Sequence, residues 1–387
     1  MGTVSKPVRV LQIAGGFRKD ENGKALSGGI VACLHNYCPR VDESIIHFDY
    51  LALKNQCFED YRSDFEAKGS QLFCLNIQSD GIKRALAVVK QLKRFLQEHH
   101  YDAVHINIGS FFPVLCCAYA AKKAGVKQII THSHSAGIYS RRKRFFANIF
   151  KPLLPHYATD LCACSGLAAL NLYPEKMVRE GKIRIIRNAV DAERFRFDPE
   201  QRQQIRAQLG LGSEPVVGHV GRFVEVKNHK FLLAVFRELK KSVPDAKLLL
   251  VGDGELLPKM QKTAAEMGIA DSVIFAGRQM NVPLYYQAMD LFVLPSTVEG
   301  LGIVAIEAQI AGLPSFVSAV VPHEVYVTDL CRSFKLEDGE AALVEKIVDS
   351  LANSEPRRDR FDEICSAGYN IKENVKLFQD MYLKRSV

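Results

Sequence analysis

Short runs of β-branched and other apolar residues alternate, in the first half of the chain, with longer stretches in which apolar positions recur at helical spacing. The short runs are typical of strands and the longer stretches of amphipathic helices. Strands that alternate with helices form right-handed βαβ units and build a parallel sheet. The strand-like runs are VRVLQIAGG, SIIHFDYLAL, SQLFCLNI, DAVHINIG, KQIITHSHS, TDLCACS and KIRIIRNAV, and the helix-like stretches are GIVACLHNYC, GIKRALAVVKQLKRFLQEHH and VLCCAYAAKKAG.

The alternation starts again after a charged connector, AERFRFDPEQRQQIRAQLGLGSEP. Helices are expected from Asn228 to Lys241, from Glu255 to Met267 and after Gly302, between short apolar runs that indicate strands. This second series predicts a second α/β domain. Its strand-like runs are VVGHVGRF, AKLLLVGDG, SVIFAGR, DLFVLPS and PSFVSA.

The two series predict two Rossmann-like domains with doubly wound parallel sheets. We expect a first domain in residues 1–190, a second in residues 191–369, and a final helix in residues 370–387 that could cross back to pack on the first domain. Domains of this kind bind ligands outside the carboxyl ends of their strands, beside helix N-termini. Two of them in tandem would face each other across a cleft, so we look for chemistry at the strand ends.

The composition fits an ordinary globular enzyme. The chain has 387 residues, of which 48% are hydrophobic and 24% charged, and the first residues lack the apolar core and cleavage site of a secretory signal. The ten cysteines include no C-x-x-C pair, so a small disulfide scaffold is excluded, no zinc-site spacing is present, and buried reduced thiols of a cytoplasmic protein are expected. The segment from Ala103 to Ala121 lacks Asp, Glu, Lys and Arg, but His105, Asn107 and Pro113 favour a strand, a loop and a helix over a membrane span.

The net charge of +8 is unevenly distributed. From Met1 to Phe195 there are 28 lysines and arginines against 17 aspartates and glutamates, and the remainder has 23 against 26. The basic half either faces an anionic partner, such as a membrane surface, or carries its cations on solvated helix faces. Nucleic acid is disfavoured as a partner, because the chain has no basic run interleaved with aromatic residues.

Two cations follow the first strand of the expected second domain. Arg222 comes directly after a strand and a glycine, and Lys227 stands just before an expected helix. Guanidinium groups grip phosphate oxygens and lysine adds a point charge, so the pair indicates a diphosphate site, although a solvated loop could carry the same residues. The turns that end the next two strands contain Gly252, Gly254, Gly277 and Arg278.

Two glutamates, Glu299 and Glu307, stand eight positions apart in the otherwise apolar stretch EGLGIVAIEAQIAGLP. A buried carboxylate is costly unless another group pairs with it. Gly300 and Gly302 let backbone approach a ligand closely, and a helix that begins near Gly302 directs free amides toward an anion. Carboxylates beside such amides suit the hydroxyls of a sugar, and the alternative for Glu307 is a pairing with a lysine on its helix face.

Taken in order, the motifs G-R-x4-K-N, G-D-G and E-G-L-G-x4-E-A resemble the nucleotide-sugar domain of the family-four retaining glycosyltransferases with the GT-B fold, and the glutamates match the E-x7-E signature of that family. The first half is similar too, and the resemblance covers essentially the whole chain. The element THSHS is similar to a subgroup from bacterial capsular and exopolysaccharide clusters. The matching segments of the first half are Gly15-Gly16, Gly28-Gly29, DAVHI, THSHS, ATDLCACS and IRNAVDAERF, in which relatives commonly have glycine for Ala189.

The resemblance implies a role for each matching residue. Arg222 and Lys227 would neutralise the donor diphosphate and stabilise the leaving nucleotide. Glu299 would hold the transferred sugar, and Glu307 would bind the ribose hydroxyls. Backbone at Gly277 would contact the base. The full set with backbone or side chains expected at the donor is Gly28, Gly29, Gly252, Gly254, Gly277, Arg278, Gly300, Leu301, Gly302 and Glu307.

A family histidine at the end of the THSHS strand contacts the transferred sugar or the acceptor. Side chains two apart on an extended strand face the same way, so His132 and His134 could both line the site. Which of them matches the family histidine stays open, with His132 preferred, and the other would be a satisfied core histidine. Two departures from the family are the inserted FRKDENGKALS between Gly16 and Gly28, which leaves the phosphate-contacting glycine open, and Asn107 in a place where relatives often have histidine.

These features imply a retaining enzyme that transfers a hexose-type sugar from a nucleoside diphosphate, with UDP preferred, to a hydroxyl of a glycan or lipid-linked acceptor. No cofactor is expected beyond the nucleotide-sugar co-substrate, and the absence of D-x-D predicts no metal requirement. The alternatives are a nucleotide-sugar epimerase on the same fold and a non-catalytic sugar-nucleotide-binding partner subunit. A dinucleotide oxidoreductase is disfavoured, because neither first βα turn has the sequence G-x-G-x-x-G.

One segment bears on the location of the protein. SRRKRFFANIFKPLLP has four consecutive cations before Phe145, Phe146, Ile149 and Phe150, which recur at helical spacing. A basic amphipathic helix is typical of a membrane surface, but a helix packed on a sheet has the same stripe, and we favour packing for the stripe. The cations would then serve an anionic surface or a lipid-diphosphate acceptor. The expected location is the cytoplasm, either free or peripheral on the inner face of the plasma membrane.

Overall fold

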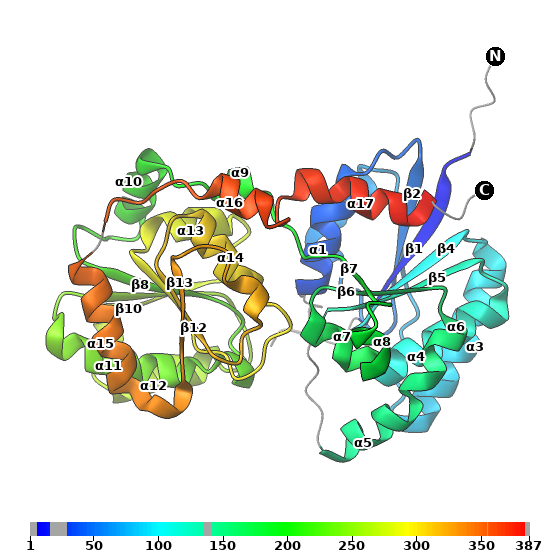
Figure 1. The fold of residues 1–387 in the computed structure, drawn as a ribbon, viewed down its shortest axis with the longest axis horizontal. Helices are drawn as coiled ribbons and strands as arrows, with labels where there is room; N and C mark the ends of the chain where they lie inside the picture. Colours follow the sequence, from blue (N-terminus) through cyan, green and yellow to red (C-terminus); the bar gives the residue numbers. More distant parts are fainter. Residues whose placement is uncertain (1–5, 16–28, 135–140, 354, 384–387) are drawn as a thin grey trace. The chain divides into compact units, whose positions relative to one another are not determined.

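The computed structural model describes residues 6–15, 29–134, 141–353 and 355–383. The chain divides into two compact units (Figure 1), of which unit 1 comprises Met1–Ala189 with Ile371–Val387 and unit 2 comprises Val190–Asn370. Each unit is built on one parallel sheet, with helices connecting its strands. The predicted fold class of two Rossmann-like α/β domains is therefore confirmed.

Unit 1 holds a seven-stranded sheet in the order β3-β2-β1-β4-β5-β6-β7, and the pairings are parallel throughout. Each of the strand-like runs of the first half forms one of these strands, so the periodicity located them correctly. The strands are β1 Val8–Ala14, β2 Ile46–Ala52, β3 Leu72–Cys74, β4 Ala103–Asn107, β5 Gln128–Ser133, β6 Asp160–Ala163 and β7 Arg184–Ile185.

The helices of unit 1 cover both faces of this sheet (Figure 1). The segment from Ala103 to Ala121 forms β4 and most of α4, as expected, and among the described residues no helix is both long and apolar enough to cross a membrane. The helices are α1 Gly29–Tyr37, α2 Arg62–Glu66, α3 Gly81–His99, α4 Phe111–Ala124, α5 Arg141–Phe150, α6 Leu154–Tyr157, α7 Gly166–Leu172, α8 Glu175–Arg179 and α17 Ile371–Leu383.

The last helix, α17, completes the core of unit 1. It lies beside α1 (Figure 1), where the rings of Tyr37 and Phe378 are 4.7 Å apart. Ile371, Phe378 and Met381 are buried in one cluster with residues of β1, β2 and α1. Residues from the far end of the chain therefore belong to the first unit.

Unit 2 holds a six-stranded parallel sheet in the order β10-β9-β8-β11-β12-β13. Its strands are β8 Val216–Val220, β9 Lys247–Val251, β10 Val273–Gly277, β11 Leu291–Leu294, β12 Ser315–Ser318 and β13 Cys331–Phe334. Its helices are α9 Ala192–Phe195, α10 Pro199–Gln208, α11 His229–Ser242, α12 Leu257–Glu266, α13 Val282–Ala288, α14 Ile303–Ile310, α15 Gly339–Ala352 and α16 Phe361–Ser366.

The charged connector, in which the sequence pattern indicated no helix, contains α9 and α10. Asp198 caps α10 by accepting hydrogen bonds from the amides of Glu200 and Gln201, and Pro199 takes the first helical position. The hydrophobic pattern missed this helix because α10 is held to the rest of unit 2 mainly through arginines.

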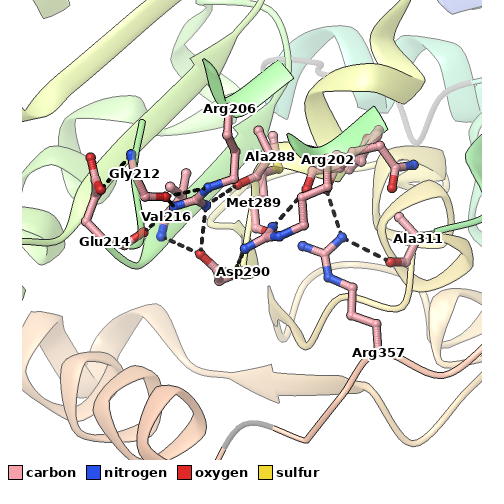
Figure 2. A network of polar contacts seen from close by, with 12 residues as sticks. Arg202, Arg206, Gly212, Glu214, Val216, Ala288, Met289, Asp290, Ala311 and Arg357 are labelled. Carbon is pink, nitrogen blue, oxygen red and sulfur yellow. Dashed lines mark hydrogen bonds and ion pairs between the residues drawn. The ribbon is translucent and has the colours of Figure 1, made fainter. Parts of the chain in front are cut away.

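Figure 2 shows these arginines together with Asp290. Arg202 donates to the carbonyls of Gln287 and Met289, both at 2.9 Å, and Arg206 donates to the carbonyl of Ala288 at 2.8 Å. Both guanidinium groups also contact the Asp290 carboxylate. Cations at the C-terminal end of a helix are favourable, so α10 fixes the end of α13.

Arg357 extends the network to α14 (Figure 2). Its guanidinium points at the carbonyls of Tyr286 and Ala311, at 3.4 and 3.5 Å, and lies 4.6 Å from the centroid of the Phe197 ring. Burial lowers the pKa of Arg357 to about 9, and the neighbouring Arg202 also lowers it. The C-terminal ends of α13 and α14 are thus held by the same arginine.

The apolar stripe of α5 is exposed, which differs from the expectation drawn from the sequence. Ala147 is buried, but Phe145, Phe146, Ile149 and Phe150 are 64, 44, 54 and 38% exposed. Packing on the sheet was the favoured explanation of this stripe, and it is wrong for these four side chains. Helical spacing identifies the helix, but it does not reveal whether anything covers the apolar face.

The ten cysteines are all free thiols, and seven of them are buried, as the sequence predicts. Burial raises the pKa of Cys38 and of Cys162 to about 12, so these thiols stay protonated.

Candidate functional site in the strand-end loops

Four loops at the carboxyl ends of the strands of unit 2 are tied together by backbone hydrogen bonds. The loop after β8 receives a bond at Val226 O from Thr297 N, 2.8 Å, in the loop after β11. Its Phe223 N donates to Asp253 O, 2.7 Å, after β9. Gly252 N in turn donates to Gly277 O, 2.8 Å, at the end of β10. The strand order therefore gathers segments up to 80 residues apart in the sequence into one rim.

Gly252 and Gly254 make close contact with the loop after β8. A Cβ atom on Gly252 would lie 2.0 Å from the carbonyl oxygen of Gly221, and one on Gly254 would lie 2.5 Å from that of Phe223. Both glycines also have positive φ angles, +146° and +147°. Gly252 and Gly254 therefore pack against the two residues on either side of Arg222 and help to position it.

Lys227 and Glu299, predicted for different parts of the donor, contact each other directly. The Lys227 ammonium pairs with Glu299 Oε1, which also accepts a hydrogen bond from Ser296 Oγ at 2.7 Å. The side chains of Lys227 and Glu299 are only 18 and 11% exposed, and Ser296 is fully buried. The glutamate is therefore paired and oriented, and these contacts compensate the free-energy cost of burying its carboxylate.

Glu307 stands in the second turn of α14 in a different environment. The Tyr286 hydroxyl lies 2.8 Å from Glu307 Oε2 and 3.1 Å from the carbonyl of Val304. Burial raises the pKa of Glu307 from 4.5 to about 7, although the Tyr286 hydroxyl opposes this change. The alternative pairing with a lysine is not what the structure shows: the observed partner is a tyrosine on α13.

The remaining predicted positions of unit 2 lie on the same rim. Arg222 is half-buried and follows β8 after one glycine, and Arg278 is half-buried directly after β10. Gly302 is the N-cap of α14 with a φ of +84°, so the left-handed backbone there favours glycine. Leu301 is buried, with 3% of the residue exposed.

The two histidines of unit 1 are both held by side chains of the neighbouring strand. His132 Nδ1 lies 3.2 Å from His105 Nε2, and His134 Nε2 lies 2.9 Å from Asn107 Oδ1. The rings of His132 and His134 are 3.9 Å apart. Burial lowers the pKa of His134 to about 4, against the opposing influence of the Asn188 side chain, and it also lowers the pKa of His132.

The glycine-rich start of unit 1 is only partly described. Gly29 begins α1, whereas Gly28 and the inserted segment of residues 17–27 lie outside the described residues. Within the part of the chain that the structure describes, no group of three or more His, Cys, Asp or Glu side chains could hold a metal ion.

Family models match both units of the chain. The model described as "Glycosyltransferase Family 4" matches residues 28–194, and the one described as "Glycosyl transferases group 1" matches residues 201–365. The chain belongs to the family-four glycosyltransferases. It is thus a transferase of the GT-B type, as the ordered motifs implied.

Named relatives cover most of the chain. The putative glycosyltransferase EpsF of Bacillus subtilis is 28% identical over 385 residues, which is 98% of this chain and 97% of EpsF. The UDP-Gal:alpha-D-GlcNAc-diphosphoundecaprenol alpha-1,3-galactosyltransferase of Escherichia coli is 26% identical, over 78% of this chain and 81% of the relative. The crystal structure of Anabaena HepE in complex with UDP and glucose has a TM-score of 0.75 at 17% identity, over 97% of this chain and 100% of HepE. At this identity the HepE structure shows the shared fold.

Sequence reasoning about this glycosyltransferase missed the side chains that support the predicted ones. Ser296 stands three residues before Glu299, but it belongs to no motif that would indicate a role. Tyr286 lies 21 positions before Glu307 in a helix of mixed composition. Asn107 was noted as a departure from the family, and its contact with His134 explains why a polar residue suits that place. Only the fold could pair Tyr286 with Glu307 and Asn107 with His134, since each of these partners comes from a different element.

Proposed function

We propose that this glycosyltransferase transfers a hexose-type sugar, with retention, from a UDP-sugar to a hydroxyl of a glycan or lipid-linked acceptor in surface polysaccharide biosynthesis. The observation that carries the proposal is the contact of Lys227 with Glu299 on a rim whose loops are hydrogen-bonded to one another. Lys227, which would bind the diphosphate, and Glu299, which would bind the sugar hydroxyls, lie side by side. Glu307, in the next helix, would accept hydrogen bonds from the ribose.

The chemistry of these groups fits the loss of a nucleoside diphosphate. Negative charge develops on the leaving phosphates, and Arg222 with Lys227 would stabilise it. When the diphosphate binds, the Lys227 ammonium can donate a hydrogen bond to a phosphate oxygen in place of its contact with Glu299. That exchange would free Glu299 to accept hydrogen bonds from the sugar. The histidines would contact the transferred sugar or the acceptor.

The choice of UDP is supported by one structural neighbour and one relative. The HepE crystal structure contains UDP and glucose, and the Escherichia coli relative is named for UDP-Gal. Another relative, from Mycolicibacterium smegmatis, is named a GDP-mannose-dependent mannosyltransferase, at 29% identity over 59% of this chain. The donor test must therefore include both bases.

A thermal-shift series with UDP-, GDP- and ADP-sugars, followed by turnover with the best donor, tests the proposal. We expect stabilisation by a UDP-sugar, a product with the anomeric configuration of the donor, and turnover that EDTA does not reduce. Arg222→Ala and Lys227→Ala should each lower turnover at least a hundredfold. Lys262→Ala, an exposed cation on α12, is the matched control and should leave turnover unchanged.

Four results would count against the proposal. Binding or turnover with none of the donors would refute it, and so would full activity of both charge variants. A change of the donor sugar without any acceptor would favour the epimerase alternative. Donor binding with neither transfer nor hydrolysis would favour the non-catalytic partner subunit.

We also propose that the exposed side chains of α5 contact an anionic lipid surface. Phe145, Phe146 and Ile149 are exposed, and they follow directly on the four cations of residues 141–144. Phe112 is 39% exposed with its ring 6.0 Å from that of Phe150, so α4 widens the apolar surface. Aromatic side chains next to cations suit the boundary between headgroups and acyl chains of an anionic membrane.

Vesicle sedimentation tests this surface. We expect binding to vesicles with phosphatidylserine, weaker binding to pure phosphatidylcholine, and a loss with rising salt. Phe145→Ser with Ile149→Ser should reduce binding about tenfold or more. Leu377→Ser on α17, which replaces a side chain that is 66% exposed, should have no effect. Equal binding of the double variant and the wild type would refute the proposal.

A further inference from the structure

A buried polar network connects the C-terminal helix to the strand-end histidines of unit 1. Gln12 of β1 and His105 of β4 are partners in the strand register, and both lie at the hydroxyl of Tyr382 on α17. The Tyr382 oxygen is 2.9 Å from Gln12 Nε2 and 2.7 Å from His105 Nδ1. Tyr382, Gln12 and His105 are fully buried, so each of their polar atoms needs a partner inside the protein.

One backbone atom fixes the direction of the hydrogen bonds in one branch. The side-chain amide of Asn107 lies 3.1 Å from the carbonyl oxygen of His105, and a carbonyl can only accept. The nitrogen of that amide must therefore face the carbonyl, and the oxygen Oδ1 faces His134 Nε2 at 2.9 Å. Since Oδ1 also only accepts, His134 must carry its proton on Nε2.

The same amide nitrogen sets the second branch. Asn107 Nδ2 also donates to Gln12 Oε1, 2.9 Å, so the nitrogen of Gln12 faces Tyr382 and donates to its hydroxyl. We assign the hydroxyl proton of Tyr382 to a hydrogen bond with His105 Nδ1, 2.7 Å away, as the acceptor. With that assignment, a neutral His105 donates from Nε2 to His132 Nδ1 at 3.2 Å, and a neutral His132 keeps its own proton on Nε2.

Both histidines at the strand end are thereby left with one polar atom to offer. His132 Nε2 and His134 Nδ1 are buried, and neither makes a hydrogen bond of ordinary geometry with a described residue, although the backbone of Ile186 faces His132 and the side chain of Asn188 faces His134. In the tautomers derived above, the first is an N–H donor and the second is a lone-pair acceptor. Burial lowers the pKa of His105, His132 and His134, which favours the neutral forms that this scheme requires.

We propose that this network holds His105, His132 and His134 as neutral tautomers protonated on Nε2, and that Tyr382 is the positioning residue that fixes the His105–His132 branch. His134 would then accept a hydrogen bond from a hydroxyl at Nδ1, and His132 would donate one to a hydroxyl oxygen. The ligand class is a polyhydroxylated one, such as the transferred sugar or its acceptor. This assignment of a ligand rests on the proposed function, whereas the tautomers rest on the network alone.

Long-range proton–nitrogen NMR of protein labelled with ¹⁵N-histidine tests the tautomers without any substrate. The spectrum separates protonated from unprotonated ring nitrogens, and single His→Gln variants assign the three rings. We expect an unprotonated Nδ1 and a protonated Nε2 in each of His105, His132 and His134 at pH 7. A proton on Nδ1 of any of the three, or a charged ring, would overturn the proposal.

Removal of one hydroxyl then separates the two branches. Tyr382→Phe takes the donor away from His105 Nδ1, so the resonances of His105 and His132 should shift toward a mixture of tautomers. His134 should keep its signature, because the carbonyl that sets its branch is unchanged. Tyr101→Phe, which removes a hydroxyl that lies 2.9 Å from Asp49 Oδ2, should alter none of the three rings.

Kinetics add a readout that a purely structural role would not move. Tyr382→Phe should lower kcat for sugar transfer about tenfold while leaving the affinity for UDP unchanged, because Arg222, Lys227 and Glu307 all belong to unit 2. Unchanged spectra or an unchanged kcat in Tyr382→Phe would refute the positioning role. If Tyr382→Phe does not fold, the wild-type spectrum still decides the tautomers, and if no transfer is found at all, only the proposed function fails.

Discussion

At the scale of single residues, the two glutamates of EGLGIVAIEAQIAGLP differ in what surrounds them. Glu299 is paired with a lysine and a serine, so its negative charge is compensated before any donor binds. Glu307 contacts the hydroxyl of Tyr286, and burial raises its pKa to about 7. One carboxylate is therefore paired and oriented in advance, whereas burial brings the pKa of the other to about 7.

The pH dependence of Glu307 gives a first prediction. Its pKa is raised on folding, so its contribution favours the folded state below about pH 4.5 and is lost as the pH rises through about 7. Ribose hydroxyls donate to the carboxylate, so affinity for UDP should move the other way and increase from pH 6 to pH 8. Calorimetric titration measures this increase.

Glu307→Gln is the matched control, because it keeps the size of the side chain and removes the titration. We expect this variant to bind UDP with an affinity that does not change between pH 6 and pH 8. A wild type whose affinity is flat over the same range would contradict the assignment of Glu307 to the ribose. The melting temperature of each protein, measured at the same pH values, reports the stability contribution separately.

At the scale of elements, the rim of unit 2 depends on close backbone contact between loops. The G-D-G turn after β9 was interpreted from the sequence as a donor-binding element. The structure adds that it supports the loop after β8, since Phe223 N donates to Asp253 O and Leu256 N donates to Phe223 O. The position of Arg222 therefore depends on glycines about 30 residues further along the chain.

Gly252→Ala tests this dependence. A methyl group 2.0 Å from Gly221 O must push the two loops apart, and the positive φ adds strain, so we expect a loss of about 3 kcal/mol in the free energy of unfolding. Turnover should fall further than stability explains, because Arg222 moves with its loop. Denaturant unfolding and donor kinetics measure the two effects.

Gly268→Ala serves as the control for backbone strain alone. Gly268 has a φ of +71°, but a Cβ atom there would meet nothing within 4 Å. This substitution should cost only about 1 kcal/mol and leave turnover unchanged. If Gly252→Ala and Gly268→Ala destabilise the protein equally, the close contact between the loops does not contribute to the effect of Gly252→Ala on stability.

At the scale of the whole molecule, the two units draw on the chain differently. Unit 2 is one continuous segment, Val190–Asn370, and it contains the four strand-end loops with both glutamates. Unit 1 is discontinuous, because its core includes Ile371, Phe378, Met381 and Tyr382 from α17. The last helix is therefore needed to complete the core of the unit that begins the chain.

Two fragments test this organisation. Residues 190–370 expressed alone should fold with a cooperative thermal transition and should bind UDP, since the proposed nucleotide-binding residues all lie within them. A chain that stops at residue 370 should keep that transition but lose the transition of unit 1. Each buried α17 side chain contributes about 2 kcal/mol, and the four together are comparable to the stability of a domain. Circular dichroism and calorimetry provide the readouts, and a chain of residues 1–370 with both transitions intact would contradict the prediction.

Some features were predictable because they depend on local pattern. The strands of both sheets except β13, and the helix after Gly302, follow from apolar periodicity and glycine positions. The order of the motifs identified the family, since G-R-x4-K-N and E-G-L-G-x4-E-A each fit within one loop and one helix start. Helix α10 and strand β13 were missed because their sequences have weak apolar periodicity, and α10 is held by arginines.

The sequence by itself thus determined the fold class, the family and the residue types at the strand ends, because each of these can be recognised from short contiguous segments of the chain. Tertiary structure decided which groups meet: Lys227 with Glu299, Tyr286 with Glu307, and Tyr382 with His105. It also decided that the apolar stripe of α5 is exposed. The physical reason is that hydrogen-bond partners, burial and the resulting pKa values depend on segments brought together from distant parts of the chain, and no local pattern of residues specifies that proximity.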